Sequence, residues 1–496
     1  MKTGTENMAN DTLDDADSEC LDCGYQPELK RTLGSFQVFA VSFAFISVAV
    51  GIFATYDELL GTAGPVGIWL WILAAVGQAL VALVVAQFAA RIALSGSSYQ
   101  WASRLANPKI GWLFGWLTFW YLAIAVVALD NALASQALMP LMGMAENEDT
   151  ARFITVAVLI LQAVLVIAST RLLGLITSSA VGIELAIVVV LVIALAAVVA
   201  FTGSGSLDNL TSRGIAAGDP NYFGIGGGLM AGMIMGLTTL VGFDSAANLA
   251  EEAKDPFRSV PRAIVASVVS AGVLGLLFLI ALTVAIKDIP AVSASGSPVA
   301  AIIRSQFGPV VERILLAGLA FAMFGAGMVI MAACSRQVFA MARDERFPAH
   351  TWMRKVNPRT QTPVFATILI LAVGVVLMVA LPGEALLQLI IGSTILPALI
   401  YGAIVILYLV VRKRLDHRPG GFSLGRFEVP VAIAALLWEA IVLFVLVTPG
   451  DATVPSLIVA GLILAGGIYF AYLRLRHPQV LDTEPGEDIF AQQETA

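Results

Sequence analysis

Long apolar runs recur along the whole chain, and short stretches that hold most of the charged residues separate them. Each run is close to the ~20 residues that an α-helix needs to cross the hydrocarbon core of a bilayer. Strands of a membrane barrel would instead alternate apolar and polar residues over about 10 positions. The pattern therefore predicts an all-α polytopic membrane protein with twelve transmembrane helices. The predicted spans are residues 36–56, 66–90, 110–138, 152–170, 175–201, 225–250, 263–286, 312–334, 363–381, 385–411, 429–447 and 455–473.

The composition supports this class of protein and excludes several others. Of the 496 residues, 58% are hydrophobic and 13% are charged, whereas soluble domains are about 45–50% apolar and about 25% charged. The formal net charge is −7, and acidic residues crowd the two ends of the chain. We therefore expect an acidic cytoplasmic tail at residues 1–35, one membrane domain at 36–475 and a second cytoplasmic tail at 476–496. No basic patch with interleaved aromatic residues suggests a nucleic-acid partner.

Lys and Arg residues fall mainly on one side of the predicted membrane domain. With an even number of spans both termini lie on one side, and 23 of the 28 Lys and Arg residues share that side with them. The positive-inside rule places this side in the cytoplasm. The sequence therefore predicts a multi-pass protein of the cytoplasmic (plasma) membrane with both termini cytoplasmic.

Residues that typically bind metals or perform catalysis are sparse. Cys20 and Cys23 form a single Cys-x-x-Cys pair in the acidic tail, and no second pair or nearby His completes the four ligands of a zinc site. All three His residues fall in segments between or beyond the predicted spans, and the chain has no Walker phosphate-binding loop. We expect no metal, no cofactor and no enzymatic activity.

Two predicted spans carry a glycine interruption at matching places. Residues 47–53 (SVAVGIF) interrupt the first span, and residues 238–245 (TTLVGFDS) interrupt the sixth. These spans are the first helices of two five-span halves, at about residues 36–201 and 225–411. Short, glycine-interrupted spans at corresponding positions of two halves are the best sequence indication of a transporter's binding site.

An interruption of this kind predicts a site with two poles. The half-helix that begins near Gly51 would present its N–H groups and positive dipole end to an anion such as a carboxylate. The half-helix that ends near Val241 would present bare carbonyl groups to a cation such as an ammonium, so the site suits a zwitterion. The alternative is that Gly51 and Gly242 only allow helices to pack closely, but the match between the two spans favours the binding site.

Few ionisable or amide side chains lie within the predicted spans. Glu184 is the clearest intramembrane carboxylate, and such a group is costly in lipid and points to a function. We expect it to load and release a proton; the alternative is a neutral Glu held by hydrogen bonds for packing. Asp130 and Asn131, toward the outer end of the third span, would line the external vestibule or reach to water. Glu439 lies outside the paired halves and is expected to be structural.

Five segments resemble a known family. Residues 242–264 (GFDSAANLAEEAKDPFRSVPRAI) resemble the end of span six and the following loop in the amino acid–polyamine–organocation superfamily. Residues 49–53 (AVGIF) resemble its broken first helix, and 94–105 (LSGSSYQWASRL) and 335–348 (SRQVFAMARDERFP) resemble its loops after spans two and eight. Residues 170–174 (TRLLG) are most similar to the amino acid/choline transporter branch, which includes 4-aminobutyrate permeases.

The resemblance covers about residues 30–475 and implies a fold and an activity. The fold would be leucine-transporter-like, an inverted repeat of five plus five helices with broken helices 1 and 6, and with two extra helices at 429–473. The activity would be secondary active transport by alternating access, usually proton symport or exchange. The substrate would be an amino acid or a related amine, moved across the lipid bilayer; the oligomeric state is left open.

The family pattern also assigns roles to residues of the two interruptions. The carboxylate of the substrate would meet the N–H groups around Val50, Gly51 and Ile52. The amino group would meet carbonyl groups at Ser47, Val48, Thr238 and Val241. Some relatives have a large aromatic gating residue at the position of Thr238. In this chain Phe243 is the weaker candidate for that role. The candidate substrate-binding residues are therefore Ser47, Val48, Val50, Gly51, Ile52, Thr238, Val241, Gly242 and Phe243.

The coupling ion is expected to be a proton. Glu184 falls near the position where some proton-coupled relatives have a Lys that replaces a sodium ion, and a carboxylate there can instead accept a proton. Sodium-coupled relatives take hydroxyl ligands from span eight, but residues 314–333 contain no Ser or Thr, which argues against sodium coupling there. The alternatives are a choline, polyamine or 4-aminobutyrate carrier, an amino acid exchanger, or, in another class, a transporter-like nutrient sensor.

Overall fold

The computed structural model describes residues 24–145, 147–295, 297–381, 383–415, 421–448 and 453–485. Cys20 and Cys23 lie outside these residues. Within them all regular elements are helical, and one isolated β-bridge pairs Leu33 with Ala253. The predicted all-α class is thus confirmed for the described part of the chain.

The helices follow one another in two sets. The first set is α2 (Ser35–Ile46), α3 (Val48–Thr62), α4 (Leu70–Ala89), α5 (Ser97–Leu105), α6 (Pro108–Ala132), α7 (Met139–Leu141), α8 (Glu148–Ala168) and α9 (Thr170–Thr202). The second set is α10 (Gly228–Gly232), α11 (Ile234–Thr239), α12 (Ser245–Asn248), α13 (Pro256–Val284), α14 (Ile289–Ser293), α15 (Pro298–Phe307), α16 (Pro309–Arg343), α17 (His350–Met353), α18 (Val364–Ala380), α19 (Gly383–Ser393), α20 (Ile395–Val411), α21 (Glu428–Val447), α22 (Thr453–Arg476) and α23 (Pro478–Asp482).

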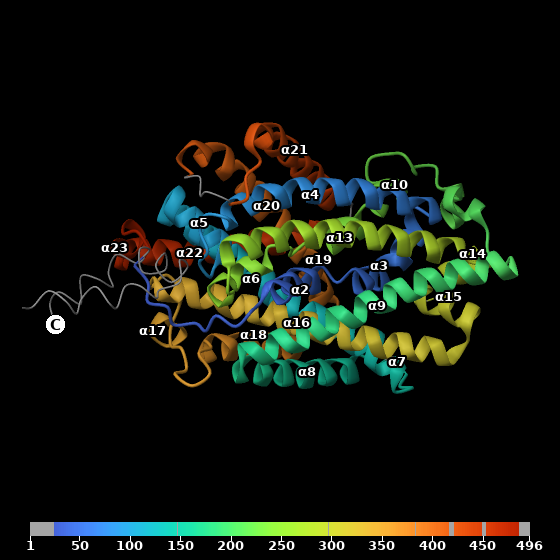
Figure 1. The fold of residues 1–496 in the computed structure, drawn as a ribbon, viewed down its shortest axis with the longest axis horizontal. Coiled ribbons are helices and arrows are strands. Elements are labelled where there is room, and N and C mark those ends of the chain that lie inside the picture. Colours follow the sequence, from blue (N-terminus) through green and yellow to red (C-terminus); the bar gives the residue numbers. More distant parts are fainter. Residues whose placement is uncertain are drawn as a thin grey trace, which may run out of the picture.

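The long helices run side by side along the longest axis of the molecule (Figure 1). Among the described residues, ten helical segments are long and apolar enough to cross a membrane, and Gly228–Thr239 and Val364–Ala380 are two shorter apolar helices. Figure 1 places α5, α17 and α23 at one end of the bundle, the terminal end, and α7, α14 and α15 at the other, the distal end. The protein is therefore a multi-pass helical membrane protein.

Local sequence signals explain where several long helices begin. Asn107 caps α6 by accepting a hydrogen bond from the N–H of Lys109, Asn147 caps α8, and Ser169 caps α9. Such side chains satisfy N–H groups that have no partner inside the helix. The core lies where α13 packs on α2 and α4, and where α16 packs on α6 and α9.

Small residues allow the sixth span to approach both the end of the first span and the second span, α4. A Cβ added at Gly232 would lie 2.5 Å from the Cβ of Ala63, and one added at Gly236 would lie 2.6 Å from the Cβ of Ala74. Side chains at these glycines would therefore collide with neighbouring helices, as expected of small residues at a close contact.

Both interruptions appear in the structure, but their limits differ from the prediction. The first span breaks at Ser47, whose backbone is left-handed (φ 39°, ψ 76°), and the second half-helix begins at Val48 rather than near Gly51. The first half of the sixth span ends at Thr239, and Gly242 has a φ of 77° inside the break. The predicted span 225–250 is thus three short helices, α10 to α12, rather than one helix with a local kink.

Candidate functional site

The two breaks border a cavity of about 250 Å³ in the middle of the bundle, the central cavity. It lies among the two broken spans, α6 and the junction of α19 with α20. Its lining residues are Phe45, Ile46, Ser47, Val50, Gly51, Ala54, Thr55, Tyr121, Ala125, Ala128, Leu129, Ala132, Leu237, Thr238, Thr239, Val241, Ile390, Ser393, Thr394 and Pro397. No charged side chain is among these described lining residues, so a charged ligand would be met chiefly by backbone groups and hydroxyls.

The structure brings five of the nine candidate substrate-binding residues to this cavity. They are Ser47, Val50, Gly51, Thr238 and Val241. The other four, Val48, Ile52, Gly242 and Phe243, are outside its lining. The Phe243 ring is fully buried and stacks on Tyr401, with centroids 4.7 Å apart, so it does not present a gate to the central cavity.

The α3 half-helix directs its N-terminus at the break. The N–H of Gly51 already donates to the carbonyl of Ser47 at 2.9 Å, so it is used within the helix. The first N–H groups of a helix have no such acceptor, which leaves those of Val48, Ala49 and Val50. Of these three residues, Val50 lines the central cavity.

Glu184, on α9, occupies the outer side of the same helix N-terminus. Its Oε1 accepts hydrogen bonds from the N–H of Ala49 at 3.0 Å and from the Oγ of Ser47 at 3.2 Å. The side chain is 2% exposed and does not line the central cavity. An acidic group is favourable at the positive end of a helix. Because Glu184 does not line the central cavity, it contacts the break on the side away from that cavity.

The opposite pole lies at the C-terminal end of α11. The last carbonyl groups of a helix have no intrahelical donor, and Leu237, Thr238 and Thr239 all line the central cavity. Across the break, the carbonyl of Phe243 is taken by the Ser42 hydroxyl at 2.7 Å. The cavity is therefore bordered by helix N–H groups on one broken span and by helix carbonyls on the other.

Gly51 is also the point of contact between the two broken spans. A Cβ at Gly51 would lie 2.2 Å from the Cγ2 of Thr239 and 2.5 Å from its Oγ1. Gly51 therefore both packs closely against α11 and lines the central cavity. From the sequence alone, these two roles are alternatives.

Two groups of lining residues were missed by sequence reasoning. Ala125, Ala128 and Ala132 form a row of short side chains on one face of α6, at the i, i+3, i+7 spacing of a helix face. Ser393 and Thr394 lie where α19 gives way to α20. The run Gly392-Ser393-Thr394 within an apolar span was the available signal for the second group; short alanines in a membrane helix give none.

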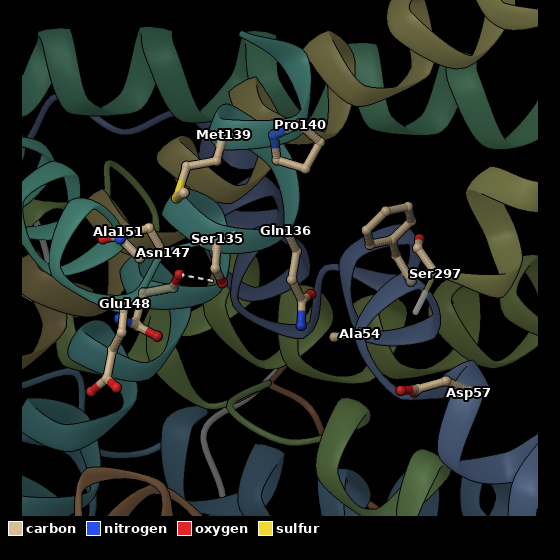
Figure 2. A pocket seen from close by; sticks show the side chains of 12 residues that line it. Ala54, Asp57, Ser135, Gln136, Met139, Pro140, Asn147, Glu148, Ala151 and Ser297 are labelled. Atoms are coloured by element: carbon tan, nitrogen blue, oxygen red, sulfur yellow. Dashed lines mark hydrogen bonds between the residues drawn. The ribbon is translucent and has the colours of Figure 1, made fainter. Parts of the chain in front are cut away.

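A larger pocket of about 580 Å³, the vestibule, opens toward the distal end. Figure 2 shows Asn147 and Glu148 on one side of it and Asp57 and Ser297 on the other, with Gln136 between them. Ala54 lines both the vestibule and the central cavity. The two spaces therefore adjoin, and the central cavity faces the distal end of the bundle.

The two predicted vestibule residues have different positions. Asn131 lines the vestibule. Asp130 does not: it is fully buried, and its Oδ1 accepts a hydrogen bond from the Nε2 of Gln162 at 2.8 Å. Consecutive residues point to different faces of a helix, so α6 directs Asp130 into the contact with α8 instead.

Ion pairs close the terminal end. Glu252 and Arg336 form a pair at 2.6 Å in which both side chains are fully buried, and Glu251 pairs with Arg343 at 2.8 Å. The hydroxyls of Tyr25 and Tyr99 both donate to Asp344. Burial raises the pKa of each of these two tyrosines above its ordinary value, so both hydroxyls keep the proton that they donate.

The last described helix adds a further contact at the same end. Arg346 donates from Nε to the carbonyl of Val480 at 2.9 Å and from Nη2 to the carbonyl of Thr483 at 2.7 Å. Lys109 pairs with Asp482 at 2.7 Å, and the side chain of Leu481 is buried. The terminal end is thus shut in this structure while the distal end is open.

A multi-pass helical bundle with two broken helices around a central cavity defines a membrane transporter. Residues 33–469 match the family described as amino acid permease, and the chain belongs to that family. The amino-acid permease BAT1 of Arabidopsis thaliana is 28% identical over 88% of this chain and 89% of its own length. The GABA-specific permease of Saccharomyces cerevisiae is 27% identical (86% and 77% covered), and a putative polyamine transporter of Candida albicans is 24% identical (92% and 87% covered).

Proposed function

We propose that this permease moves amino acids or related amines by proton-coupled alternating access, with Glu184 as the proton-carrying group. The single observation that carries the proposal is the position of Glu184, whose Oε1 accepts from Ala49 N–H and Ser47 Oγ at the break of the first span. The names of the relatives, which include amino-acid, GABA and polyamine carriers, support the substrate class.

The substrate is proposed to bind by its two charges in the central cavity. Its carboxylate would take N–H groups at the α3 N-terminus, with Val50 facing the cavity, and its ammonium would take the carbonyls of Thr238 and Thr239 at the end of α11. Helix ends supply both charges without any charged side chain. The hydroxyls of Thr55 and Ser393, which also line the cavity, donate to the carbonyls of Gly51 and Ile390 and would serve only as further acceptors for the ammonium.

The coupling follows from competition for one helix end. An ionised Glu184 neutralises the positive end of α3, so it opposes a second carboxylate there. Protonation removes that negative charge, and the α3 N-terminus then becomes available to the carboxylate of the substrate. Proton and substrate would therefore bind together, which is the requirement for symport.

The arrangement in the membrane extends the same proposal. The ten long apolar segments together with Gly228–Thr239 and Val364–Ala380 would make twelve spans, as two inverted five-helix repeats and two extra helices. The Lys and Arg distribution supports a cytoplasmic terminal end. The open vestibule would then face outward, in a plasma membrane.

Uptake by the full chain in proteoliposomes tests this function. We expect labelled amino acids to accumulate when the outside is made acidic, and a sodium gradient alone to drive nothing. Glu184→Gln keeps a side chain that can bond to the break but cannot ionise, so it should abolish accumulation against a gradient while equal exchange persists. Glu439→Gln, a change at a buried acid on α21 away from the cavity, is the matched control and should leave accumulation intact.

Two results would contradict parts of this proposal. Sodium-driven uptake that is insensitive to Glu184→Gln would remove the proton coupling. Saturable binding of amino acids with no transmembrane movement would indicate a sensor rather than a carrier.

A further inference from the structure

A second, much smaller cavity lies beneath the central cavity, toward the terminal end. Its volume is about 10 Å³, roughly the space that one water molecule needs. Its lining comprises Phe45, Thr118, Tyr121, Leu122, Asp244, Ser245, Asn248, Pro397, Ile400 and Tyr401. Phe45 and Tyr121 line both cavities, and their ring centroids are 5.8 Å apart. These two rings therefore form part of the partition between the two spaces.

The polar groups of this small cavity are incompletely bonded. The Oδ1 of Asp244 accepts from the Tyr401 hydroxyl at 2.7 Å, and that hydroxyl accepts from the Gly242 N–H at 2.9 Å. The hydroxyl of Tyr121 and the Oδ1 of Asn248 have no partner among the described residues. Their side chains are only 7% and 2% exposed, and buried polar atoms of this kind normally have a partner.

The carboxylate of Asp244 also lacks a counter-charge. No Lys or Arg is among the described lining residues of either cavity. An unpaired carboxylate within a membrane protein is costly, and such groups usually face a partner or a ligand pathway. The cavity therefore combines one carboxyl group without a basic partner with two unused oxygen atoms, next to the space assigned to the substrate.

We propose that this cavity receives the second ammonium group of a cationic substrate, a basic amino acid or a diamine, and that Asp244 is the residue that selects it. An ammonium group has three N–H donors and no acceptor, and it is close in size to a water molecule. The carboxylate of Asp244, the amide oxygen of Asn248 and the hydroxyl oxygen of Tyr121 would be its three acceptors. The rings of Phe45 and Tyr121, which are in contact in this structure, would move apart to admit the alkyl stem of the substrate.

A single water molecule could satisfy the same three oxygens, but it would leave the charge of Asp244 without compensation. An ammonium neutralises that charge, which is why the geometry favours a cation. This inference rests on the proposed function, because it needs the first ammonium and the carboxylate of the substrate to bind in the central cavity.

Paired ligands that differ only in the second ammonium test the proposal on the unmodified full chain. L-Lysine is compared with L-norleucine, and 1,5-diaminopentane with pentylamine, by thermal stabilisation of the purified protein and by competition for uptake in proteoliposomes. A site built to bond a polar group strongly rejects the analogue without it. We therefore expect lysine to act at concentrations at least about tenfold lower than norleucine. The reason is that a buried carboxylate without a partner is stabilised when an ammonium group bonds to it.

Variants then assign the preference to the small cavity. Asp244→Asn should remove the preference for lysine over norleucine while norleucine itself still binds, and Glu439→Gln should leave the preference unchanged. Asn248→Leu removes one acceptor without altering the charge and should reduce the preference by a smaller factor. Asn248→Leu also tests the role of the small cavity if Asp244→Asn does not fold.

The outcomes separate this inference from the proposed function. Equal action of lysine and norleucine on the unmodified protein would mean that the cavity holds only water, and the inference would be wrong although transport stands. A preference for lysine that survives both Asp244→Asn and Asn248→Leu would place the selecting group elsewhere. Failure of every amino acid and amine to bind or move would overturn the proposed function itself.

Discussion

At the scale of single residues, Ser47, Glu184 and Gly51 determine the geometry of the first break. Ser47 takes the left-handed backbone that separates α2 from α3, and its hydroxyl bonds to Glu184. Gly51 leaves room for Thr239 on the other broken span. The break is thus held by a contact from α9 on one side and by a contact from α11 on the other.

Substitution of Gly51 is expected to disturb the contact between the two broken spans. Because a Cβ there would lie 2.2 Å from Thr239 Cγ2, Gly51→Ala should cost about 1–3 kcal/mol through overpacking. Gly51→Leu should abolish uptake in proteoliposomes while the protein still purifies as a folded species, as judged by size-exclusion profile and helical circular dichroism.

Two control variants accompany Gly51→Ala: one removes the predicted steric clash, and the other adds a methyl group where there is open space. Thr239→Ala removes two of the atoms that a Cβ at Gly51 would meet, so it should restore part of the uptake of Gly51→Ala. Gly61→Ala lies in the same helix with open space around it and should behave as the unmodified protein. Normal uptake by Gly51→Leu would show that this contact has no part in transport.

At the scale of elements, the terminal end is closed by the segment after the sixth span meeting the end of α16. Glu251 and Glu252 follow α12, whereas Arg336 and Arg343 lie on the last turns of α16. The residues before α2 join them, because the N–H groups of Thr32 and Leu33 both donate to the carbonyl of Glu252. Opening of this end requires that these contacts separate.

The buried pair of Glu252 with Arg336 should be the strongest of these contacts. Removal of one partner of a buried ion pair costs about 3–5 kcal/mol, because the other charge is left without compensation. Glu252→Gln should therefore lower the thermal unfolding midpoint in detergent markedly. Glu252→Gln combined with Arg336→Met should be less destabilising than Glu252→Gln alone.

An exposed pair provides the comparison. Glu345 and Arg354 are 46% and 47% exposed at 3.4 Å, and exposed pairs contribute about 0–1 kcal/mol. Glu345→Gln should leave the midpoint nearly unchanged. Equal destabilisation by Glu252→Gln and Glu345→Gln would show that the buried pair does not stabilise this closed form.

At the scale of the whole molecule, the structure combines an open distal end with a shut terminal end. The vestibule and the central cavity adjoin at Ala54, and the ion pairs and α23 close the other side. If the terminal end is cytoplasmic, as its basic residues suggest, this is the form that takes substrate from outside.

Labelling of single cysteines from one side of the membrane tests that orientation. Leu207 is exposed and follows Ser206, whose N–H donates to the carbonyl of Val284 shortly before α14 at the distal end, and Thr351 is exposed in α17 at the terminal end. In a background with Cys20 and Cys23 changed to Ser, Leu207→Cys should react with an impermeant maleimide added to whole cells. Thr351→Cys should react only after the cells are made permeable.

The buried Cys334 provides the baseline, since the background protein should not react under either condition. Labelling of Thr351→Cys in intact cells, with Leu207→Cys protected, would invert the proposed topology.

Much of the architecture could be predicted from the sequence, because apolar run length and glycine interruptions are local signals. The position of the first break could not be, since it depends on Ser47 meeting Glu184, which is 137 residues away along the chain. The same limit applies to Phe243, which packs on Tyr401 instead of facing the cavity. The sequence predicts that Asp130 lines the vestibule or reaches water, because nothing in its own span indicates its partner, Gln162.

The row of alanines on α6 has a consequence for how such a carrier can diversify. Ala125, Ala128 and Ala132 shape one wall of the central cavity, whereas Glu184 meets the first break from α9, outside that lining. A mutation that enlarges one of these alanines would alter which cargo fits without touching the group proposed to carry the proton. Gene duplicates could therefore acquire new substrates while they keep the same driving force.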